Sequence, residues 1–292
     1  MSDVAMVTEI ESTYRAGDGC PLNVYEWSSR EVLSRPTPLV VIMHGYAEHC
    51  GRYREFAQAL VRAGHWVSGF DARGHGKSPG QRGHIARYDQ YVDDLHGFMQ
   101  AVRRRFPDRP LILLGHSNGG LTALRLVQSR KHVADGLVLS SPLVALQKWH
   151  QPVPRWVAVA LSAVVPRFPL PNGLKARELT HDVAILEMQR RDRLGHGRST
   201  PSWYVEATGA MQWAFASLDT VRLPVMVLAA EKDPIVVPDA VVKLYEGMPS
   251  PDKSLEIVPD SFHEILNELG RQDTYRLIFR WLSLRWKAGA AA

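Results

Sequence analysis

Cysteine is scarce in this chain: only Cys20 and Cys50 occur among 292 residues. A disulfide-stapled secreted scaffold is therefore disfavoured, and two free thiols in a reducing compartment are expected. At this length roughly three quarters of the surface of the unfolded chain can be buried. The core consequently needs neither a disulfide nor a metal ion for stability.

Long hydrophobic runs are also missing. The longest, Trp156 to Val165, is about half the length needed to span a bilayer. The N-terminal segment contains Asp3 and Glu9 and lacks the basic-then-apolar pattern of a signal peptide. A soluble cytoplasmic protein is therefore expected.

Motifs for cofactors and metals are incomplete. Gly76-Lys77-Ser78 resembles the end of a phosphate-binding loop, but Asp71 stands where that loop requires its first glycine. His263-Glu264 resembles the start of a zinc-protease motif, but Asn267 replaces the second histidine. No dinucleotide fingerprint occurs, so no cofactor and no metal site are predicted.

The net charge of +5 is uneven, with an excess of Lys and Arg between Leu143 and Phe215. This segment has no basic run with interleaved aromatic residues, and no nucleic-acid-binding module is recognisable. A nucleic-acid partner is therefore not expected. The default interpretation is solvated charge, and contact with an anionic lipid surface is the second.

Short apolar runs alternate with segments of helical periodicity along most of the chain. A hairpin, Glu9–Arg15 with Pro21–Trp27, precedes this alternation. Fully apolar strands that alternate with helices predict a mostly parallel sheet covered by helices on both faces. The predicted strands are Leu39–Met43, Trp66–Phe70, Leu111–Leu114, Gly136–Leu139, Val225–Ala230 and Leu255–Val258, and the helices are Arg52–Ala63, Tyr88–Phe106, Gly119–Ser129, Pro238–Tyr245 and Arg271–Trp286.

The alternation is interrupted by a segment rich in proline and tryptophan. It divides the chain into a core, residues 1–141 and 218–292, and an insertion, residues 142–217. Helical pieces are predicted at Val157–Val165 and Leu179–Asp192, and an insertion between two sheet strands is a candidate lid. The tail Lys287–Ala292 is expected to fray.

Gly115-His116-Ser117-Asn118-Gly119 matches the G-x-S-x-G pattern and lies between a predicted strand and a predicted helix. That context favours a nucleophile elbow over a plain glycine turn. A strained turn projects the serine hydroxyl, and the glycines are expected to keep neighbouring β-carbons from clashing with it. Ser117 is therefore the predicted nucleophile.

A serine hydroxyl needs a base that takes its proton and an acid that orients the base. Asp233 follows the strand Val225–Ala230, and His263 follows the next predicted strand. The order Ser, Asp, His is the order used in α/β-hydrolases, and active sites form at the carboxyl ends of parallel strands. His263 is the predicted base and Asp233 the predicted acid, with Glu231 and Asp239 as rival acids.

The oxyanion of an acyl-transfer reaction also needs hydrogen-bond donors. The backbone N–H of Asn118, directly after the nucleophile, is one predicted donor. The N–H of Tyr46, in the loop after the first core strand, is the other. His44 is expected only to brace this loop with a hydrogen bond.

Together these segments resemble the monoacylglycerol lipase and lysophospholipase branch of the α/β-hydrolase superfamily. The resemblance is carried by the elbow and by His44-Gly45-Tyr46-Ala47-Glu48-His49-Cys50-Gly51-Arg52-Tyr53, Phe70-Asp71-Ala72-Arg73-Gly74-His75-Gly76-Lys77-Ser78, Gly80-Gln81-Arg82-Gly83-His84, Tyr91-Val92-Asp93-Asp94-Leu95, Leu179-Thr180-His181-Asp182 and Phe262-His263-Glu264-Ile265-Leu266-Asn267-Glu268.

The resemblance implies an α/β-hydrolase fold with a helical lid, over an acyl-chain tunnel, inserted between core strands. It implies a triad of Ser117, Asp233 and His263 and an oxyanion hole at Tyr46 and Asn118. Two positions depart from the family pattern. Asn118 stands where methionine is usual, which is expected to change the polarity of the pocket. Tyr46 is bulkier than the small residue often found there, which is expected to narrow the site.

The expected activity is hydrolysis of the ester of a single-chain acylglycerol, a lipid substrate met at or near a membrane surface. A lysophospholipase and a general carboxylesterase or thioesterase share the same triad and remain alternatives, and a catalytically silent binding protein is a fourth. The segment Trp156 to Val165 is expected to line an acyl tunnel or to enter a lipid interface. The alternative interpretation of this segment is a helix that packs on the core, with solvated cations around it.

Overall fold

The structure is a computed structural model that describes residues 6–150 and 154–286. An eight-stranded sheet forms its centre, with the strand order β1-β2-β4-β3-β5-β6-β9-β10. The strands are β1 (Thr8–Arg15), β2 (Pro21–Ser28), β3 (Leu39–Met43), β4 (Trp66–Phe70), β5 (Leu111–His116), β6 (Gly136–Ser140), β9 (Val225–Ala230) and β10 (Lys253–Val258).

The strands from β4 to β10 in this order are parallel, and near one edge β2 runs antiparallel to both of its neighbours, β1 and β4. Every residue of β3, β4, β5, β6 and β9 is buried, which explains why these strands are apolar without alternation. The predicted mostly parallel sheet of an α/β fold is confirmed. The carboxyl ends of the parallel strands therefore all lie at the same edge of the sheet.

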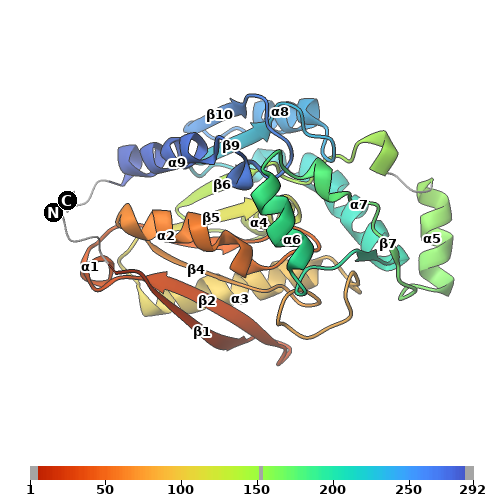
Figure 1. Ribbon diagram of the computed structural model, residues 1–292, viewed down its shortest axis with the longest axis horizontal. Helices are drawn as coiled ribbons and strands as arrows, with labels where there is room; N and C mark the ends of the chain where they lie inside the picture. The colour runs from red at the N-terminus through yellow and green to blue at the C-terminus, as the bar shows by residue number, and fades with distance from the viewer. Residues whose placement is uncertain (1–5, 151–153, 287–292) are drawn as a thin grey trace.

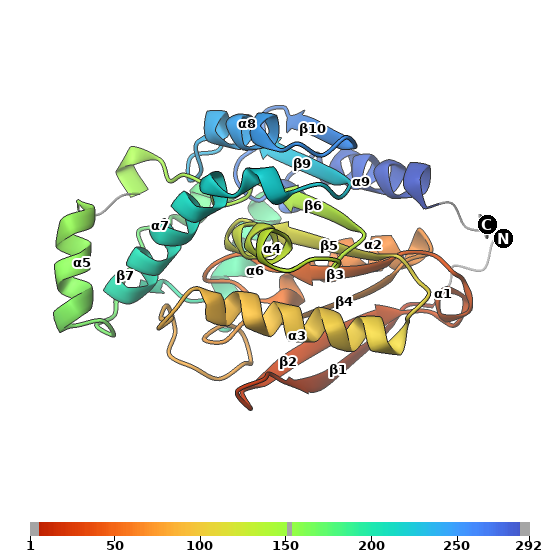
Figure 2. The same ribbon diagram turned by 180° about the vertical axis from the view of Figure 1, so that it is seen from behind.

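Helices cover both faces of this sheet (Figures 1 and 2). Helices α2 and α9 lie on one face, and α3 and α4 lie on the other. The core helices are α1 (Arg30–Ser34), α2 (Arg54–Arg62), α3 (Asp89–Arg105), α4 (Asn118–Ser129), α8 (Pro238–Gly247) and α9 (Arg271–Arg285).

The segment between β6 and β9 extends beyond the carboxyl ends of the strands (Figure 1). It contains α5 (Arg155–Val164), α6 (Val183–Arg191), α7 (Pro201–Ala216) and a two-stranded sheet of β7 (Leu170–Pro171) and β8 (Arg198–Ser199). The sequence does not predict α7. This helix packs against both α4 and α5, so its apolar residues are not confined to one stripe and leave no clear helical period.

The helix predicted at Leu179–Asp192 begins later, at Val183. Its N-cap is Asp182, whose carboxylate accepts hydrogen bonds from the backbone N–H groups of Ala184 and Ile185. Residues 179–182 are therefore outside the helix, and the prediction is wrong at this end. The physical reason is that Asp caps a helix better than it continues one.

Both cysteines are free thiols, as expected. The tail predicted to fray, Lys287–Ala292, lies outside the described residues. Within the described ranges, none of the helices combines the length and the apolar character that a membrane crossing requires.

Candidate active site

Ser117 lies at a sharp turn between β5 and α4. Its φ of 51° is unusual for a residue with a side chain, and α4 begins directly after it at Asn118. The flanking glycines prevent clashes between backbone segments. The sequence had instead predicted that they keep neighbouring β-carbons away from the serine hydroxyl. A β-carbon at Gly115 would clash with the backbone of Gly119, and one at Gly119 would clash with the carbonyl oxygen of Met43. The glycines therefore let β5, α4 and the β3 loop approach closely.

The side chains of Ser117, His263 and Asp233 form one continuous chain of hydrogen bonds. The Ser117 hydroxyl lies 2.8 Å from His263 Nε2, and His263 Nδ1 lies 2.7 Å from Asp233 Oδ2. All three residues are buried, and they come from the carboxyl ends of three different core strands or the loops after them. This is the geometry with which an imidazole takes a proton from a hydroxyl while a carboxylate fixes its tautomer.

Asp233, and neither of its rivals, faces the imidazole. Its second oxygen, Oδ1, accepts hydrogen bonds from the N–H groups of Ile235 and Val236 at 2.8 and 2.9 Å, which fixes the carboxylate. The carboxylate of Glu231 instead accepts the N–H of Asp260. Asp239 lies in the first turn of α8.

The electrostatic surroundings favour the protonated form of His263. Burial opposes a positive charge on the imidazole, but the charge and hydrogen bond of Asp233 outweigh it, and Glu264 and Glu48 add to the effect. The pKa of His263 is consequently raised above its ordinary value of 6.5. Such an environment stabilises the imidazolium that forms when a serine gives up its proton.

Two backbone N–H groups beside Ser117 are free to donate. Asn118 is the first residue of α4, where a helix offers its N–H no partner. No hydrogen bond among the described residues uses the Tyr46 N–H. Both predicted donors therefore have the freedom that an oxyanion hole requires.

The loop that carries Tyr46 is held by Glu48, for which the sequence predicts no role. Glu48 Oε1 accepts the N–H of Gly45 at 2.5 Å and the hydroxyl of Tyr53 at 2.7 Å. The carboxyl is fully buried, and its Oε2 has no hydrogen-bond partner. Burial raises the pKa of Glu48 to about 7, with the charge of Glu264 adding to the increase.

His44 braces the same loop, as predicted. Its Nδ1 donates to the carbonyl of Gly45, and its Nε2 accepts the N–H of Ala72. Burial lowers the pKa of His44 to about 3, so the ring stays neutral. Its role is structural.

The side chain of Asn118 points away from the pocket. Its Oδ1 accepts a hydrogen bond from the hydroxyl of Tyr88 at 3.0 Å, on the side of α3. Asn118 does not line the cavity at Ser117, so the expected change in pocket polarity is wrong. The ring of Tyr46 does line this cavity, where it stacks on Trp203 with ring centroids 3.7 Å apart.

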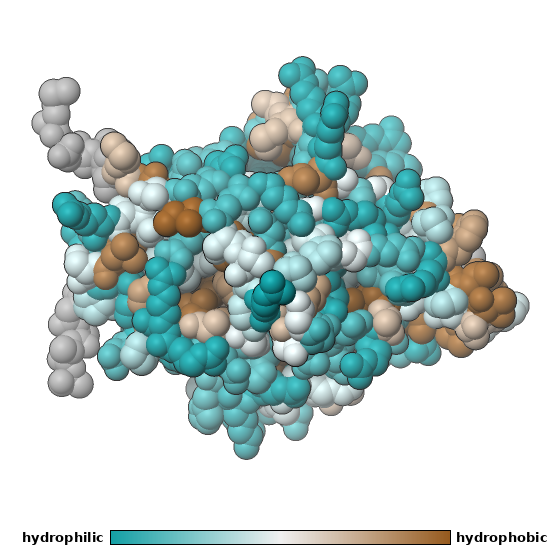
Figure 3. Space-filling model, turned by 90° about the horizontal axis from the view of Figure 1, so that it is seen from below, coloured by the Kyte–Doolittle hydropathy of each residue, from teal (hydrophilic) through white to brown (hydrophobic). Residues whose placement is uncertain are grey.

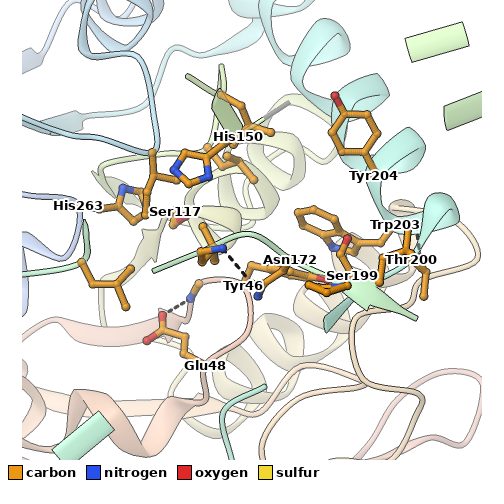
Figure 4. Close-up of a pocket in the computed structure, with 18 of the residues that line it drawn as sticks. Tyr46, Glu48, Ser117, His150, Asn172, Ser199, Thr200, Trp203, Tyr204 and His263 are labelled. Atoms are coloured by element: carbon orange, nitrogen blue, oxygen red, sulfur yellow. Dashed lines mark hydrogen bonds between the residues drawn. The ribbon is translucent and has the colours of Figure 1, made fainter. Parts of the chain in front are cut away.

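A cavity of about 320 Å³ opens at Ser117 (Figure 4). Its polar part lies around Ser117, His263 and Glu48, and its apolar part lies between the core and the insertion. The apolar lining consists of Leu143, Leu146, Ala158, Leu161, Leu170, Pro171, Leu174, Leu179, Pro201, Trp203, Tyr204 and Ile235. Such a cavity suits a ligand with one polar end and one long apolar end.

No group of three or more His, Cys, Asp or Glu side chains in residues 6–150 and 154–286 is arranged to hold a metal ion.

The chain matches a known protein family over most of its length. The family model described as Hydrolase_4, serine aminopeptidase S33, matches residues 34–270. The monoacylglycerol lipase of Mycolicibacterium smegmatis is 31% identical over 234 residues, which cover 80% of this chain and 83% of the relative. The phospholipase YtpA of Bacillus subtilis is 30% identical over 244 residues, 83% of this chain and 93% of the relative.

Among solved structures, a monoacylglycerol lipase of Paleococcus ferrophilus is 29% identical to this chain. The TM-score is 0.77, with 89% of this chain and 98% of that chain covered. The fold and most of the chain length are therefore shared with this enzyme.

Proposed function

The chain belongs to the serine aminopeptidase S33 family of the α/β-hydrolase superfamily, and we propose that it hydrolyses the ester of single-chain acylglycerols. Its most similar named relatives include a monoacylglycerol lipase and a phospholipase. The observation that carries the proposal is the continuous contact from Asp233 through His263 to Ser117 at the base of a largely apolar cavity.

In this proposal Ser117 Oγ attacks the ester carbonyl carbon while His263 Nε2 takes the hydroxyl proton. The tetrahedral intermediate collapses as His263 returns that proton to the leaving alkoxide oxygen, and the acyl group stays on Ser117. Water then attacks the acyl-enzyme by the same steps and releases the fatty acid. Asp233 holds the imidazole in the required tautomer throughout.

The N–H groups of Tyr46 and Asn118 are proposed to bind the oxyanion. Tyr46 lies in the loop after β3 and Asn118 is the first residue of α4. The fold therefore fixes the positions of both donors, which need not reorganise during the reaction. One such donor contributes roughly 10²–10³ in kcat.

The apolar lining supports one long acyl chain. Each buried methylene contributes about 0.8 kcal/mol, so the rate should rise with acyl length until the cavity is full. A second acyl chain would remain in water or meet the insertion. A single-chain substrate is therefore favoured over a diacylglycerol.

A neutral head group is favoured over a phosphodiester. The carboxyl group of Glu264 lines the polar part of the cavity, where its negative charge would repel a phosphate. The phospholipase relative keeps lysophospholipid hydrolysis as a second candidate. A thioesterase would use the same triad, and a substrate panel separates these activities.

Residues 142–217 are proposed to act as a lid that also contacts a lipid surface. Helix α5 has two faces: Ala158 and Leu161 line the cavity, whereas Trp156 and Val164 are 75% and 80% exposed. Figure 3 shows a hydrophobic area at the end of the molecule where α5 lies. The exposed cations around it are Arg155, Arg167, Lys175 and Arg177, each worth about 1 kcal/mol near an anionic lipid surface.

The test is hydrolysis of C4 to C18 monoacylglycerols beside matching lysophosphatidylcholines, diacylglycerols, acyl thioesters and short aryl esters. The expected result is a kcat/KM that rises with acyl length and is highest for monoacylglycerols. A flat or falling profile beyond C4 would instead make the protein a short-chain esterase. Preference for the lysophosphatidylcholines would select the second candidate.

A further inference from the structure

His150 is a polar residue of the insertion that faces the catalytic centre. It ends the short 3₁₀ turn Lys148–His150, which follows β6. Its side chain is only 4% exposed and lines the cavity at Ser117. Figure 4 shows its ring beside His263 and Ser117. No sequence motif includes this histidine.

A carboxylate fixes the protonation of this ring. His150 Nε2 lies 3.2 Å from Oε2 of Glu178, whose own side chain is largely covered. This contact favours the tautomer with its proton on Nε2, which leaves Nδ1 with a lone pair. The geometry at Nε2 falls short of a hydrogen bond, so Glu178 acts on the ring mainly through its charge. His150 therefore offers a hydrogen-bond acceptor to the cavity.

The surroundings of His150 favour the neutral ring. Burial lowers the pKa of His150, and the charges of Lys175 and His263 add to this decrease against the opposing effect of Glu178. A neutral acceptor pairs with a hydroxyl hydrogen, whereas an ionised phosphate has none to give.

The position of His263 indicates which part of an ester lies near His150. His263 Nε2 has to protonate the leaving alkoxide oxygen, so the alcohol part of the substrate must lie on the His263 side of Ser117. His150 is on that side, close enough to His263 for their charges to interact. In the proposed function the acyl chain takes the apolar lining, which includes Trp203 and the ring of Tyr46.

We propose that His150, held by Glu178, is a specificity residue that accepts a hydrogen bond from a free hydroxyl of the leaving alcohol. It selects esters of polyols such as glycerol over esters of simple alcohols with the same acyl chain. This inference rests on the proposed ester hydrolysis and adds the group that recognises the alcohol.

The test compares three esters of one fatty acid: the methyl ester, the 2-hydroxyethyl ester and the monoacylglycerol. These carry no, one and two free hydroxyls, and the readout is the ratio of kcat/KM for each hydroxyl-bearing ester to that of the methyl ester. A ratio cancels any loss of folded enzyme, so a variant of reduced stability stays informative. In the wild type both ratios should exceed one.

The variants remove the acceptor or its partner. His150→Phe should lower the monoacylglycerol ratio roughly tenfold, the effect of one lost hydrogen bond. His150→Asn, whose Oδ1 can accept in place of Nδ1, should restore part of it, and Glu178→Gln should lower it less than His150→Phe does. Lys148→Ala, on the same turn but exposed, is the matched control and should keep the wild-type ratio.

An unchanged ratio in His150→Phe would overturn the inference. So would a wild type that cleaves the methyl ester as well as the monoacylglycerol, although ester hydrolysis itself would then stand. A wild type that cleaves none of the three esters would instead reject the proposed function, and with it the inference.

Discussion

The carboxyl group of Glu48 accepts the N–H of Gly45 at 2.5 Å, in the peptide next to the one that presents the Tyr46 N–H. Glu48 thus fixes the loop from which one proposed oxyanion donor comes. The same oxygen accepts the Tyr53 hydroxyl, which ties the loop to the 3₁₀ turn before α2. A buried acid beside the reacting atoms is a source of pH dependence that the sequence motif alone does not reveal.

Glu48→Gln should change how stability depends on pH. The native pKa of Glu48 is about 7, against an ordinary 4.5, so between these values the folded protein holds a proton that the unfolded chain releases. The contribution of Glu48 to the free energy of unfolding is therefore complete below pH 4.5 and is lost as the pH rises to about 7. In the variant the difference in free energy of unfolding between pH 5 and pH 8 should shrink by on the order of 2 kcal/mol, measured by urea denaturation.

Glu246→Gln is the control for this measurement, because Glu246 is exposed near the end of α8. It should reproduce the pH dependence of the wild type. If Glu48→Gln does so as well, Glu48 is ionised in the folded protein throughout this range.

Ser117→Ala should abolish covalent labelling by a fluorophosphonate ester. Ser117 is the serine whose hydroxyl contacts His263, so it alone is expected to form the adduct. Mass spectrometry of the labelled wild type locates the modified residue, and Ser140→Ala, on the neighbouring strand β6, is the control. An adduct on any other serine would reject the assignment. Residual turnover of the variant should be only about 10³–10⁴-fold above the uncatalysed rate.

Asp233→Asn should retain the fold but lower kcat by roughly 10⁴, because the amide no longer stabilises the required tautomer of His263. The circular dichroism spectrum checks the fold, and steady-state kinetics give kcat. Glu231→Gln and Asp239→Asn remove the two rival acids and should each keep near wild-type activity. The reverse pattern would mean that the acid of the triad is one of these two.

The acidic limb of the pH–rate profile should lie above pH 6.5. His263 acts as a base only when neutral, and its raised pKa means that kcat/KM keeps increasing with pH beyond the ordinary histidine value. Glu264→Gln removes one of the negative charges that raise this pKa, so its limb should move to lower pH. A limb at or below pH 6.5 in the wild type would show that the carboxylates do not act on the imidazole as inferred.

The sequence predicted β3, β4, β5, β6 and β9 well because every residue of these strands is buried, which makes their sequences largely apolar. The elbow was equally clear, since Gly115 and Gly119 are required by the backbone contacts around Ser117. The insertion was predicted poorly. Helix α7 lacks a single apolar stripe because it packs on two sides, and His150 reaches the site only through the folding of the insertion.

Contacts formed by folding also decide the roles of two carboxyl groups. Glu48 is separated from Gly45 by two residues, but its hydrogen bond depends on the turn of the loop. Asp233 was the predicted acid by its position, and its contact with His263 distinguishes it from Glu231 and Asp239. Spacing along the chain gives the candidates, and three-dimensional contacts select among them.

Helix α5 allows the acyl tunnel and the lipid surface to be tested separately. Ala158 is 2% exposed and lines the cavity, so Ala158→Phe should fill part of the space for an acyl chain. The kcat/KM for C16 and C18 monoacylglycerols should then fall relative to that for C8. Binding to anionic vesicles should stay at the wild-type level, because the outer face of the helix is unaltered.

Trp156→Ala changes the other face of the same helix and should give the opposite pattern. Trp156 is 75% exposed, so its removal leaves the cavity intact but takes away apolar area that could enter a lipid interface. Sedimentation with anionic vesicles should show binding about tenfold weaker, since a buried side chain of this size contributes more than 1.4 kcal/mol. The C8 to C18 profile in detergent should keep its shape. If Trp156→Ala alters that profile while vesicle binding is unchanged, the helix contributes only to the tunnel, and its exposed tryptophan does not contact lipid.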